Sequence, residues 1–347
     1  MREISTRKRK LAREACQQVS MEAPENLPKL LNQFRENLSD ILTPDHTDAV
    51  LLKWLRARNY DLEKAERNFR EVDTNRKIFE INTLLETYVK PEVVEKYERT
   101  ACLGFAKDGT PVRYCGFADF RGFIMAMSSY DMCLFFSYYM EMDYATLRQE
   151  NKKNGGNLHE MTYIFDMEDF SLQDCVHKCV IETGMDFMRL VQDHYPEAWK
   201  HVLIVNAPGY FYRAFNFLKP IFRPTLLEKI QVISKHQTKE VLLKYIDEDV
   251  LPAFLGGKRV DSNGDPRCGE LFPAMKHTYF KIPSEYYINN RITPLSREDP
   301  GVTCVTVGAR SVLNVSLRCS QASTKYRFHY RSEGGSLSVT IFYREDL

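Results

Sequence analysis

The stretch Gln192–Lys229 decides the fold, because in QDHYPEAWKHVLIVNAPGYFYRAFNFLKPIFRPTLLEK a strand of the buried type runs directly into an aromatic helix. The sequence predicts the strand at His201–Asn206 and the helix at residues 208–223. Apolar side chains follow the helix in two neighbouring stripes, namely Phe211, Phe215, Leu218 and Phe222, and Tyr210, Ala214, Phe217 and Ile221. Together the stripes cover an arc of roughly 160°, which is wider than one contact with a protein core requires.

The remaining sector of this helix carries Arg213, Asn216, Lys219 and Arg223 and no acidic residue. A cationic edge beside an aromatic face is typical of helices that contact lipid. A helix buried in a large domain also fits the apolar stripes. The segment alone leaves both interpretations open.

Composition places the chain among soluble globular proteins. Its 347 residues are 44% apolar and 27% charged, as in ordinary folded domains. The formal net charge of +1 gives no electrostatic support for nucleic acid binding. The sequence has no apolar run long enough to span a bilayer and no apolar signal core, which predicts a cytoplasmic location.

Signatures of catalysis and of metal binding are missing. The chain has no phosphate loop, no dinucleotide fingerprint and no serine nucleophile elbow. Asp166, Glu168 and Asp169 follow a predicted strand, where acidic residues commonly cap the next helix. Cys175 and Cys179 are one helical turn apart but lack further metal ligands of suitable spacing, and the nine cysteines are expected to be reduced. We therefore predict a protein that is not an enzyme and has no catalytic residue, cofactor or metal.

The predicted fold class is α/β, and the chain divides into four segments. These are a mobile basic tail at 1–25, a helical module at 26–80, an α/β domain at 91–282 and a β segment at 300–347. Met21 is an alternative start. In the helical module the apolar spacing predicts three short helices, the third of them capped by Asp61.

Strands and helices alternate in the α/β domain, as expected for a layered fold. Strands are predicted at Val112–Phe117, Thr162–Asp166, His201–Asn206 and Ile230–Ser234, and long helices at Tyr130–Gln149 and Leu172–Tyr195. The two helices are long enough to cover one face of the sheet.

The β segment alternates strictly between apolar and polar residues. This pattern predicts half-buried strands at Ser311–Leu317, Tyr326–Tyr330 and Leu337–Tyr343. Three strands leave edges and an apolar face uncovered, so the segment is expected to form only part of a β-sandwich.

Four motifs in order resemble the CRAL-TRIO lipid-binding family with its helical N-terminal module. They are LLKWLRARNYDLEKAERNF at Leu51–Phe69, TYIFDMEDFSL at Thr162–Leu172, YPEAWKHVLIVNAPGYFYRAFNFLKP at Tyr195–Pro220 and LPAFLGG at Leu251–Gly257. The chain is most similar to the supernatant protein factor (tocopherol-associated protein) branch. This is because RFHYRSEGGSLSVTIFYRED at Arg327–Asp346 resembles the start of a GOLD domain, here truncated.

The resemblance implies a mixed sheet that floors an apolar cavity, with the helix at 208–223 as a lid that opens at a membrane. The residues expected at the cavity and lid are Tyr138, Tyr144, Ile164, Leu190, Tyr195, Ile204, Asn206, Phe211, Phe215, Leu218, Phe222 and Val232. Tyr195 or Asn206 would satisfy a single hydroxyl group of the ligand. Each of these residues also fits a role in the core alone.

The residues that read a phosphoinositide headgroup in the family are only partly present. Arg58, Glu197 and Lys229 match that set, whereas Asn59 and Leu226 stand where a lysine and a threonine are expected. A lost hydrogen bond to a charged group is worth roughly 1.5–3 kcal/mol. The resemblance therefore implies tocopherol, squalene or another isoprenoid, or a phospholipid, as cargo and makes phosphatidylinositol a weaker candidate.

The sequence as a whole predicts a monomeric carrier that transfers or presents a lipid and contacts membranes reversibly through the lid. The alternative is a lipid-sensing scaffold or regulatory module, with phosphatidylinositol as a candidate ligand, that recruits a protein partner through the β segment or the helical module.

Overall fold

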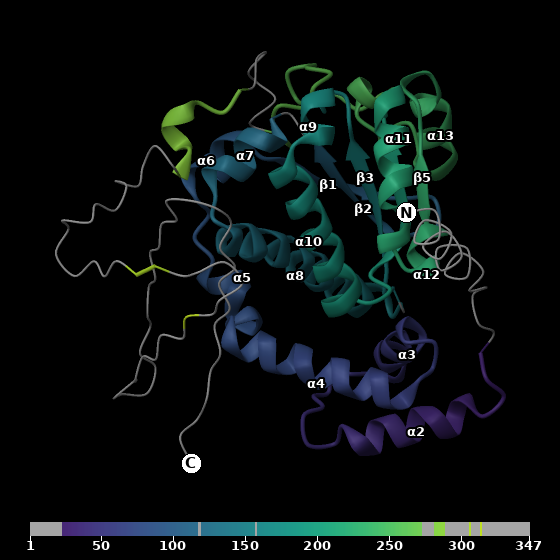
Figure 1. The fold of residues 1–347 in the computed structure, drawn as a ribbon. Helices are drawn as coiled ribbons and strands as arrows, with labels where there is room; N and C mark the ends of the chain where they lie inside the picture. Colours follow the sequence, from purple (N-terminus) through teal and green to yellow (C-terminus); the bar gives the residue numbers. More distant parts are fainter. Residues whose placement is uncertain are drawn as a thin grey trace, which may run out of the picture. The chain divides into compact units, whose positions relative to one another are not determined.

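The computed structural model describes residues 23–116, 119–156, 158–272, 281–288, 305–306 and 313. The chain divides into two compact units, Met1–Tyr287 and Ile288–Leu347, and the helices and strands labelled in Figure 1 belong to the first unit. Residues 1–22 of the predicted tail and, apart from Leu313, the three predicted strands of the β segment lie outside the described residues. No helix in the described ranges is both long enough and apolar enough to cross a bilayer.

Three helices form the N-terminal module, as predicted: α2 (Leu27–Asn37), α3 (Asp48–Ala57) and α4 (Leu62–Ile78) (Figure 1). Asp61 caps α4, since its side chain accepts a hydrogen bond from the backbone nitrogen of Lys64 at 3.0 Å. The module has its own core, which consists of Phe34, Leu38, Leu51, Trp54, Leu55, Ala65, Phe69 and Val72. Short elements lead on to the sheet, namely η1 (Ile81–Thr83), α5 (Leu84–Thr87) and α6 (Glu92–Tyr97).

The five strands of the sheet are β1 (Arg99–Phe105), β2 (Pro111–Gly116), β3 (Met161–Asp166), β4 (Trp199–Val205) and β5 (Ile230–Val232), in that spatial order. Strand β1 is antiparallel to β2, and the other neighbours are parallel. The four predicted strands are confirmed, but β1 was not predicted. Its register shifts between Cys102 and Gly104, and Gly104 has a φ of 127°, so an irregularity interrupts the alternation that marks a strand.

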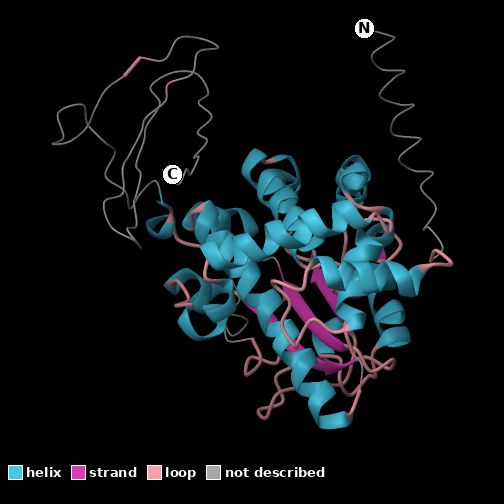
Figure 2. Cartoon of the chain, turned by 90° about the horizontal axis from the view of Figure 1, so that it is seen from below, coloured by secondary structure: helices cyan, strands magenta, loops and turns pink. Residues whose placement is uncertain are grey.

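Four helices cover one face of the sheet: α7 (Phe120–Ala126), α8 (Ser129–Asn154), α9 (Leu172–Val176) and α10 (Lys178–His194) (Figure 1). The single helix predicted at Leu172–Tyr195 is wrong, because His177 has an extended backbone (φ −77°, ψ 124°) that ends α9 and begins α10. Figure 2 shows that helices flank the strands.

Helix α11 (Gly209–Leu218) follows β4 and is shorter than the helix predicted at 208–223. Pro220 lacks the N–H group that would continue the helix, and the chain turns into η2 (Lys219–Ile221) and then α12 (Pro224–Leu227). The remaining elements are η3 (Lys235–Gln237), α13 (Thr238–Tyr245), η4 (Ala253–Leu255) and η6 (Ser284–Tyr286).

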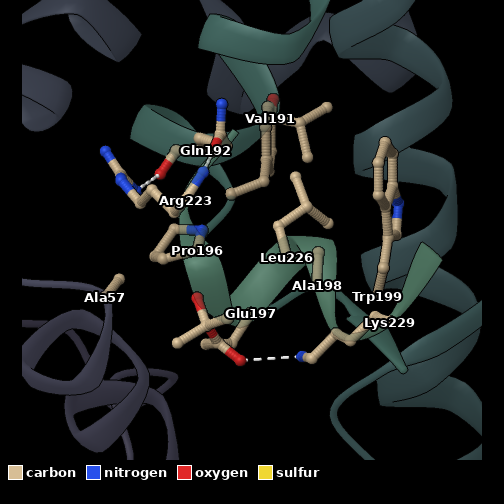
Figure 3. Close-up of a pocket in the computed structure, with 12 residues that line it drawn as sticks. Ala57, Val191, Gln192, Pro196, Glu197, Ala198, Trp199, Arg223, Leu226 and Lys229 are labelled. Carbon is tan, nitrogen blue, oxygen red and sulfur yellow. Dashed lines mark hydrogen bonds and ion pairs between the residues drawn. The ribbon is translucent and has the colours of Figure 1, made fainter. Parts of the chain in front are cut away.

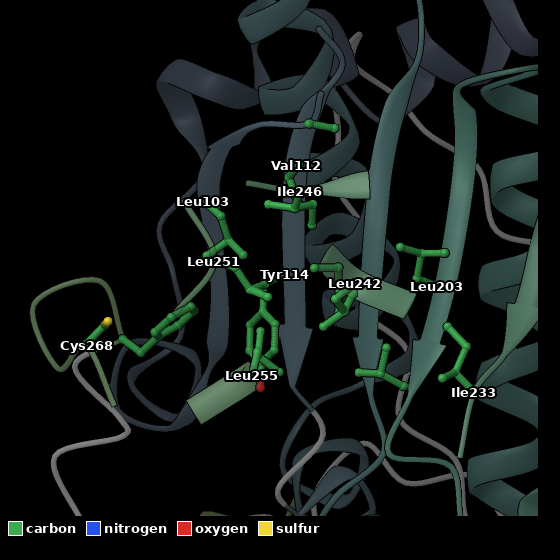
Figure 4. Close-up of a cluster of buried hydrophobic side chains, with 14 residues drawn as sticks. Leu103, Val112, Tyr114, Leu203, Ile233, Leu242, Ile246, Leu251, Leu255 and Cys268 are labelled. Carbon is green, nitrogen blue, oxygen red and sulfur yellow. The ribbon is translucent and has the colours of Figure 1, made fainter. Parts of the chain in front are cut away.

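The two faces of the sheet pack against different cores. Ile164 and Leu203 belong to the core on the side of α13, which also contains Tyr114, Leu242 and Leu255 (Figure 4). Residues one position further along the same strands face α8 and α10. This second face carries an internal cavity.

Candidate functional site

The internal cavity has a volume of about 260 Å³ and lies between the second face of the sheet and the surrounding helices. Aromatic rings supply much of its wall, namely Phe120, Phe123, Phe135, Phe136, Phe165, Phe170, Phe187, Trp199, Phe211, Phe215 and Phe222. A space of this kind suits an apolar molecule.

The floor of the cavity comes from alternate residues of β3 and β4, which are Tyr163, Phe165, Val202 and Ile204. Ile204 was expected here, whereas Ile164 lies in the core on the opposite face. The register explains the difference, because Phe165, not Ile164, pairs with Ile204 across the parallel strands. Side chains at neighbouring positions of a strand point to opposite faces.

One wall of the cavity comes from α11 and the turn after it. Phe211, Phe215, Leu218 and Phe222 all line the cavity, as the sequence predicted for a lid. The rings of Phe211 and Phe215 stack at 6.3 Å, and those of Phe215 and Phe222 lie 5.6 Å apart. Phe217 points the other way and is 84% exposed. The predicted apolar arc therefore has an inner stripe, which consists of Phe211, Phe215, Leu218 and Phe222, and one exposed aromatic side chain, Phe217, on its outer side.

The other expected cavity residues do not line this space, namely Tyr138, Tyr144, Ile164, Leu190, Tyr195, Asn206 and Val232. The Tyr195 hydroxyl donates to Glu141 Oε1 at 2.9 Å, and Asn206 Nδ2 donates to Asp166 Oδ1 at 2.8 Å. Both groups are thus engaged within the protein. Tyr144, Leu190 and Val232 pack against the core below the cavity.

Several lining residues were not predicted from the sequence, namely Glu98, Phe136, Met140, Phe187, Met188 and Trp199. Phe136 and Met140 lie one turn apart on α8, and this spacing was a usable signal. It was hidden because Tyr138 and Tyr144 lie on the same helix and are also apolar in character.

A second, much smaller pocket of about 30 Å³ lies where α3 approaches β4 and α12 (Figure 3). Lys229 and Glu197, which both line it, form an ion pair at 2.7 Å, and Lys229 also pairs with Glu160 at 2.9 Å. Leu226 is buried in its wall, and Thr225 lies beside it. Two of the three charged groups predicted for a headgroup, Glu197 and Lys229, therefore bind each other.

Arg58 and Arg223 share one carboxylate at the edge of this small pocket. Arg58 Nη2 lies 3.1 Å from Asp193 Oδ1, and Arg223 donates to the same oxygen. Burial, followed by the nearby charge of Arg223, lowers the pKa of Arg58 to about 10. Asp193 thus connects the N-terminal module with the segment that follows α11.

Lys53 is a further buried cation of the N-terminal module, and it is only 8% exposed. Its ammonium group donates to the carbonyl oxygen of His159. Burial lowers its pKa to about 8, although Glu160 acts in the opposite direction.

Within the described residues no group of His, Cys, Asp and Glu side chains is arranged to hold a metal ion. Cys175 and Cys179 are both free thiols.

The mixed sheet, the helical module and the aromatic cavity define an α/β protein built around space for an apolar ligand. Residues 30–71 match the family described as the CRAL/TRIO N-terminal domain, and residues 95–257 match the CRAL/TRIO domain. The chain therefore carries a CRAL/TRIO domain preceded by its N-terminal module. Domains of this family bind lipids and do not catalyse reactions, and the chain is accordingly a lipid-binding protein and not an enzyme.

Known proteins agree with this assignment. The chain is 23% identical over 300 residues to protein ctg-1 of Caenorhabditis elegans. This match covers 84% of this chain and 78% of that protein. It is 29% identical over 242 residues to the phosphatidylinositol/phosphatidylcholine transfer protein SFH12 of Arabidopsis thaliana, over 66% of this chain but only 43% of that protein. The crystal structure of Sfh5 has the same fold, with a TM-score of 0.50 and 14% identity over 64% of this chain and 81% of that chain.

Proposed function

We propose that the protein is a carrier that holds one hydrophobic lipid in the large cavity and transfers it between membranes or presents it at them. The supporting observation is the aromatic cavity of about 260 Å³ with α11 as one wall. A cavity of this composition is costly to hydrate and gains free energy when an apolar molecule fills it.

Lid opening would expose the inner stripe of α11 to the membrane. Moving each of Phe211, Phe215, Leu218 and Phe222 from water into lipid contributes up to ~1.5–3 kcal/mol. This is enough for reversible docking, and it offsets the loss of contacts inside the protein.

The outer surface of the lid region supports contact with a membrane before the lid opens. Phe217 is 84% exposed, and Leu172 and Val176 on the neighbouring α9 are 56% and 71% exposed. Arg213 on α11 and Lys219 directly after it are exposed, and α11 has no acidic residue. Cations near an anionic membrane contribute about 1 kcal/mol each.

Apolar cargo such as tocopherol, squalene or another isoprenoid fits the cavity better than a charged headgroup fits the small pocket. A headgroup there would have to displace the pairs of Lys229 with Glu197 and Glu160. The second candidate cargo is a phospholipid, phosphatidylinositol included. It is favoured by the lipids that the name of SFH12 states and by the position of Arg58, Glu197 and Lys229 near that pocket.

The motif at Arg327–Asp346 supports a finer proposal. On this proposal the protein belongs to the supernatant protein factor branch, and the beginning of a GOLD domain would recruit a protein partner. In this proposal the protein is a cytoplasmic monomer that associates reversibly with membranes.

Transfer of a fluorescent lipid between donor and acceptor vesicles tests the proposed carrier. Wild type should speed transfer, and Phe217→Asp should slow it because this change removes the exposed ring and repels anionic lipid. Ile78→Asp is the matched control, since Ile78 is 67% exposed but lies on α4 of the N-terminal module. No transfer by wild type, together with no lipid that purifies with it, would contradict the carrier function.

A further inference from the structure

Three consecutive residues near the start of α11 point in different directions. Side chains that follow one another on a helix are about 100° apart. Phe211 faces the cavity, so Tyr210 and Tyr212 lie on opposite flanks of the helix. The hydroxyl of Tyr210 donates to the carbonyl oxygen of Phe170 at 2.6 Å. The hydroxyl of Tyr212 donates to the carbonyl oxygen of Val232 at 3.1 Å.

The hydrogen bond of Tyr212 ties α11 to the sheet. Its acceptor Val232 is the last residue of β5, which is the edge strand and pairs with β4. Strand β4 itself continues into α11 through residues 206–208. This flank of the helix is therefore joined to the sheet both by the chain and by a hydrogen bond.

The hydrogen bond of Tyr210 instead crosses a seam. We use this word for the line along which α11 and residues 219–223 meet the loop 167–171, α9 and α10. Helix α9 packs beside α11 (Figure 1). The ring of Phe170 meets that of Phe211 edge-on at 6.0 Å, and both residues line the cavity. A lipid that passes between α11 and α9 has to part these groups.

The acceptor of the Tyr210 hydroxyl sits on a well-anchored loop. The backbone nitrogen of Phe170 donates to the carbonyl oxygen of Met167 at 3.1 Å. The next residue, Ser171, begins α9 with a capping box that it forms with Asp174. Movement of α11 alone is therefore enough to break the bond between Tyr210 and Phe170.

The other end of the seam is held by Arg223. Its backbone nitrogen donates to Gln192 Oε1 at 2.7 Å, and its guanidinium group donates to the carbonyl oxygen of Gln192 and to Asp193. The cavity-lining residues between the two ends, such as Phe215 and Leu218, have apolar side chains that form no hydrogen bonds. Hydrogen bonds thus hold the seam at its ends, and apolar contacts fill its middle.

We propose that Tyr210 is a latch: its hydrogen bond to Phe170 breaks each time α11 lifts from the seam to admit or release a lipid, while the bond of Tyr212 to Val232 persists. This inference rests on the proposed carrier function and names a residue that sets its exchange rate. The latch is closed whether the cavity is empty or filled. Its loss should therefore speed uptake and release alike and leave the equilibrium affinity unchanged.

Stopped-flow fluorescence with the methyl ester of cis-parinaric acid, a fluorescent apolar lipid, tests the proposal on the full chain. Uptake is followed after the probe is mixed with protein. Release is followed after the loaded protein is mixed with an excess of phosphatidylcholine vesicles. In Tyr210→Phe both rates should rise about fivefold, the effect of one neutral hydrogen bond, and the dissociation constant should stay within about twofold of wild type.

Tyr212→Phe is the matched control. Both tyrosines are half-buried on the same helix, and each change removes one hydroxyl that donates to a backbone carbonyl. The two variants should therefore lose similar amounts of stability. Uptake and release by Tyr212→Phe should stay within about twofold of wild type, so a general loosening of the fold would not imitate the effect of Tyr210→Phe.

The outcomes separate the latch from the carrier function. Unchanged rates in a folded Tyr210→Phe protein would overturn the latch. Faster release without faster uptake would also overturn it, because that result is weaker binding and not a lower barrier. Equal acceleration by both variants would do the same, since α11 would then leave both of its neighbours. Failure of wild type to bind the probe would instead contradict the carrier function itself.

Discussion

The large cavity and the small pocket differ in their volumes and in the side chains that line them. The first has about 260 Å³ of space among mostly aromatic and apolar side chains, and the second has about 30 Å³, with Glu197, Arg223 and Lys229 as its charged lining residues. In the small pocket Lys229 already pairs with Glu197 and Glu160, and Arg58 with Asp193. In the large cavity no rearrangement of ion pairs is needed before a ligand enters.

The ion pairs at the small pocket count against a charged headgroup as its ligand. Arg58, Glu197 and Lys229 match part of the residue set expected for a phosphoinositide, but Lys229 pairs with Glu197 and Arg58 pairs with Asp193. Binding a phosphate there would cost the existing pairs, while filling the large cavity costs only desolvation of the cargo's polar group.

The largest expected effect comes from filling the large cavity from within. Gly184 on α10 lines it, and no atom lies within 4 Å of the position where a Cβ would be added. Gly184→Phe should place its ring in the large cavity. The affinity for a fluorescent lipid probe should then fall on the order of 100-fold, or about 3 kcal/mol. A fluorescence titration measures this.

Gly184→Ala is the control for that change. One methyl group leaves most of the cavity open, so lipid binding should persist, and replacing a helical glycine should stabilise the fold by about 0.5–1 kcal/mol. Undiminished binding by Gly184→Phe would mean that the lipid occupies another place.

The charged region should respond to pH through Lys53. Its pKa of about 8 in the folded protein lies below the value of about 10.4 in the unfolded chain. The folded state therefore binds fewer protons between these values, and the free energy of unfolding should rise as the pH rises through this window.

Urea unfolding of wild type and Lys53→Met at pH 7 and pH 10 isolates this contribution. Wild type should gain about 2 kcal/mol relative to the variant, because the variant has no group to titrate. If the free energies of unfolding of the two proteins changed by the same amount between pH 7 and pH 10, Lys53 would not have a lowered pKa in the folded protein.

A smaller effect is expected at the bridge between the module and the lid region. Asp193→Asn weakens the carboxylate that Arg58 and Arg223 share, and lipid transfer between vesicles should become about two- to fivefold faster. Asp186→Asn is the control, since Asp186 pairs with Arg189 at the exposed surface of the same helix. An unchanged rate in Asp193→Asn would mean that this bridge does not restrain the lid.

Much of the fold could be predicted because its elements carry local signals. The three N-terminal helices have clear apolar spacing, and β2 to β5 are short apolar runs with polar boundaries. Strand β1 was missed because the irregularity at Gly104 breaks its alternation. The break at His177 has no proline or glycine to mark it.

The cavity-lining residues on and after α11 could be predicted from the sequence. Those on the sheet and on α8 could be predicted only in part. Phe211, Phe215, Leu218 and Phe222 could be predicted because their spacing in the sequence is helical, although Phe222 lies beyond the end of α11. Parallel strands are buried on both faces, so the apolar run at β3 does not reveal that Phe165 faces the cavity and Ile164 does not. Glu98 lines the cavity as well, and it could not be found from the sequence because a single charged residue between two elements carries no periodic signal.

A photoreactive lipid analogue tests most directly that the large cavity is the binding site. A hexadecanol with a diazirine in mid-chain would be bound to wild type and irradiated, and the modified peptides would be mapped by mass spectrometry. We expect adducts on lining residues such as Met140, Met188 and Phe211. Adducts confined to the walls of the small pocket, such as Ala57, Pro196 and Thr225, would contradict a binding site in the large cavity.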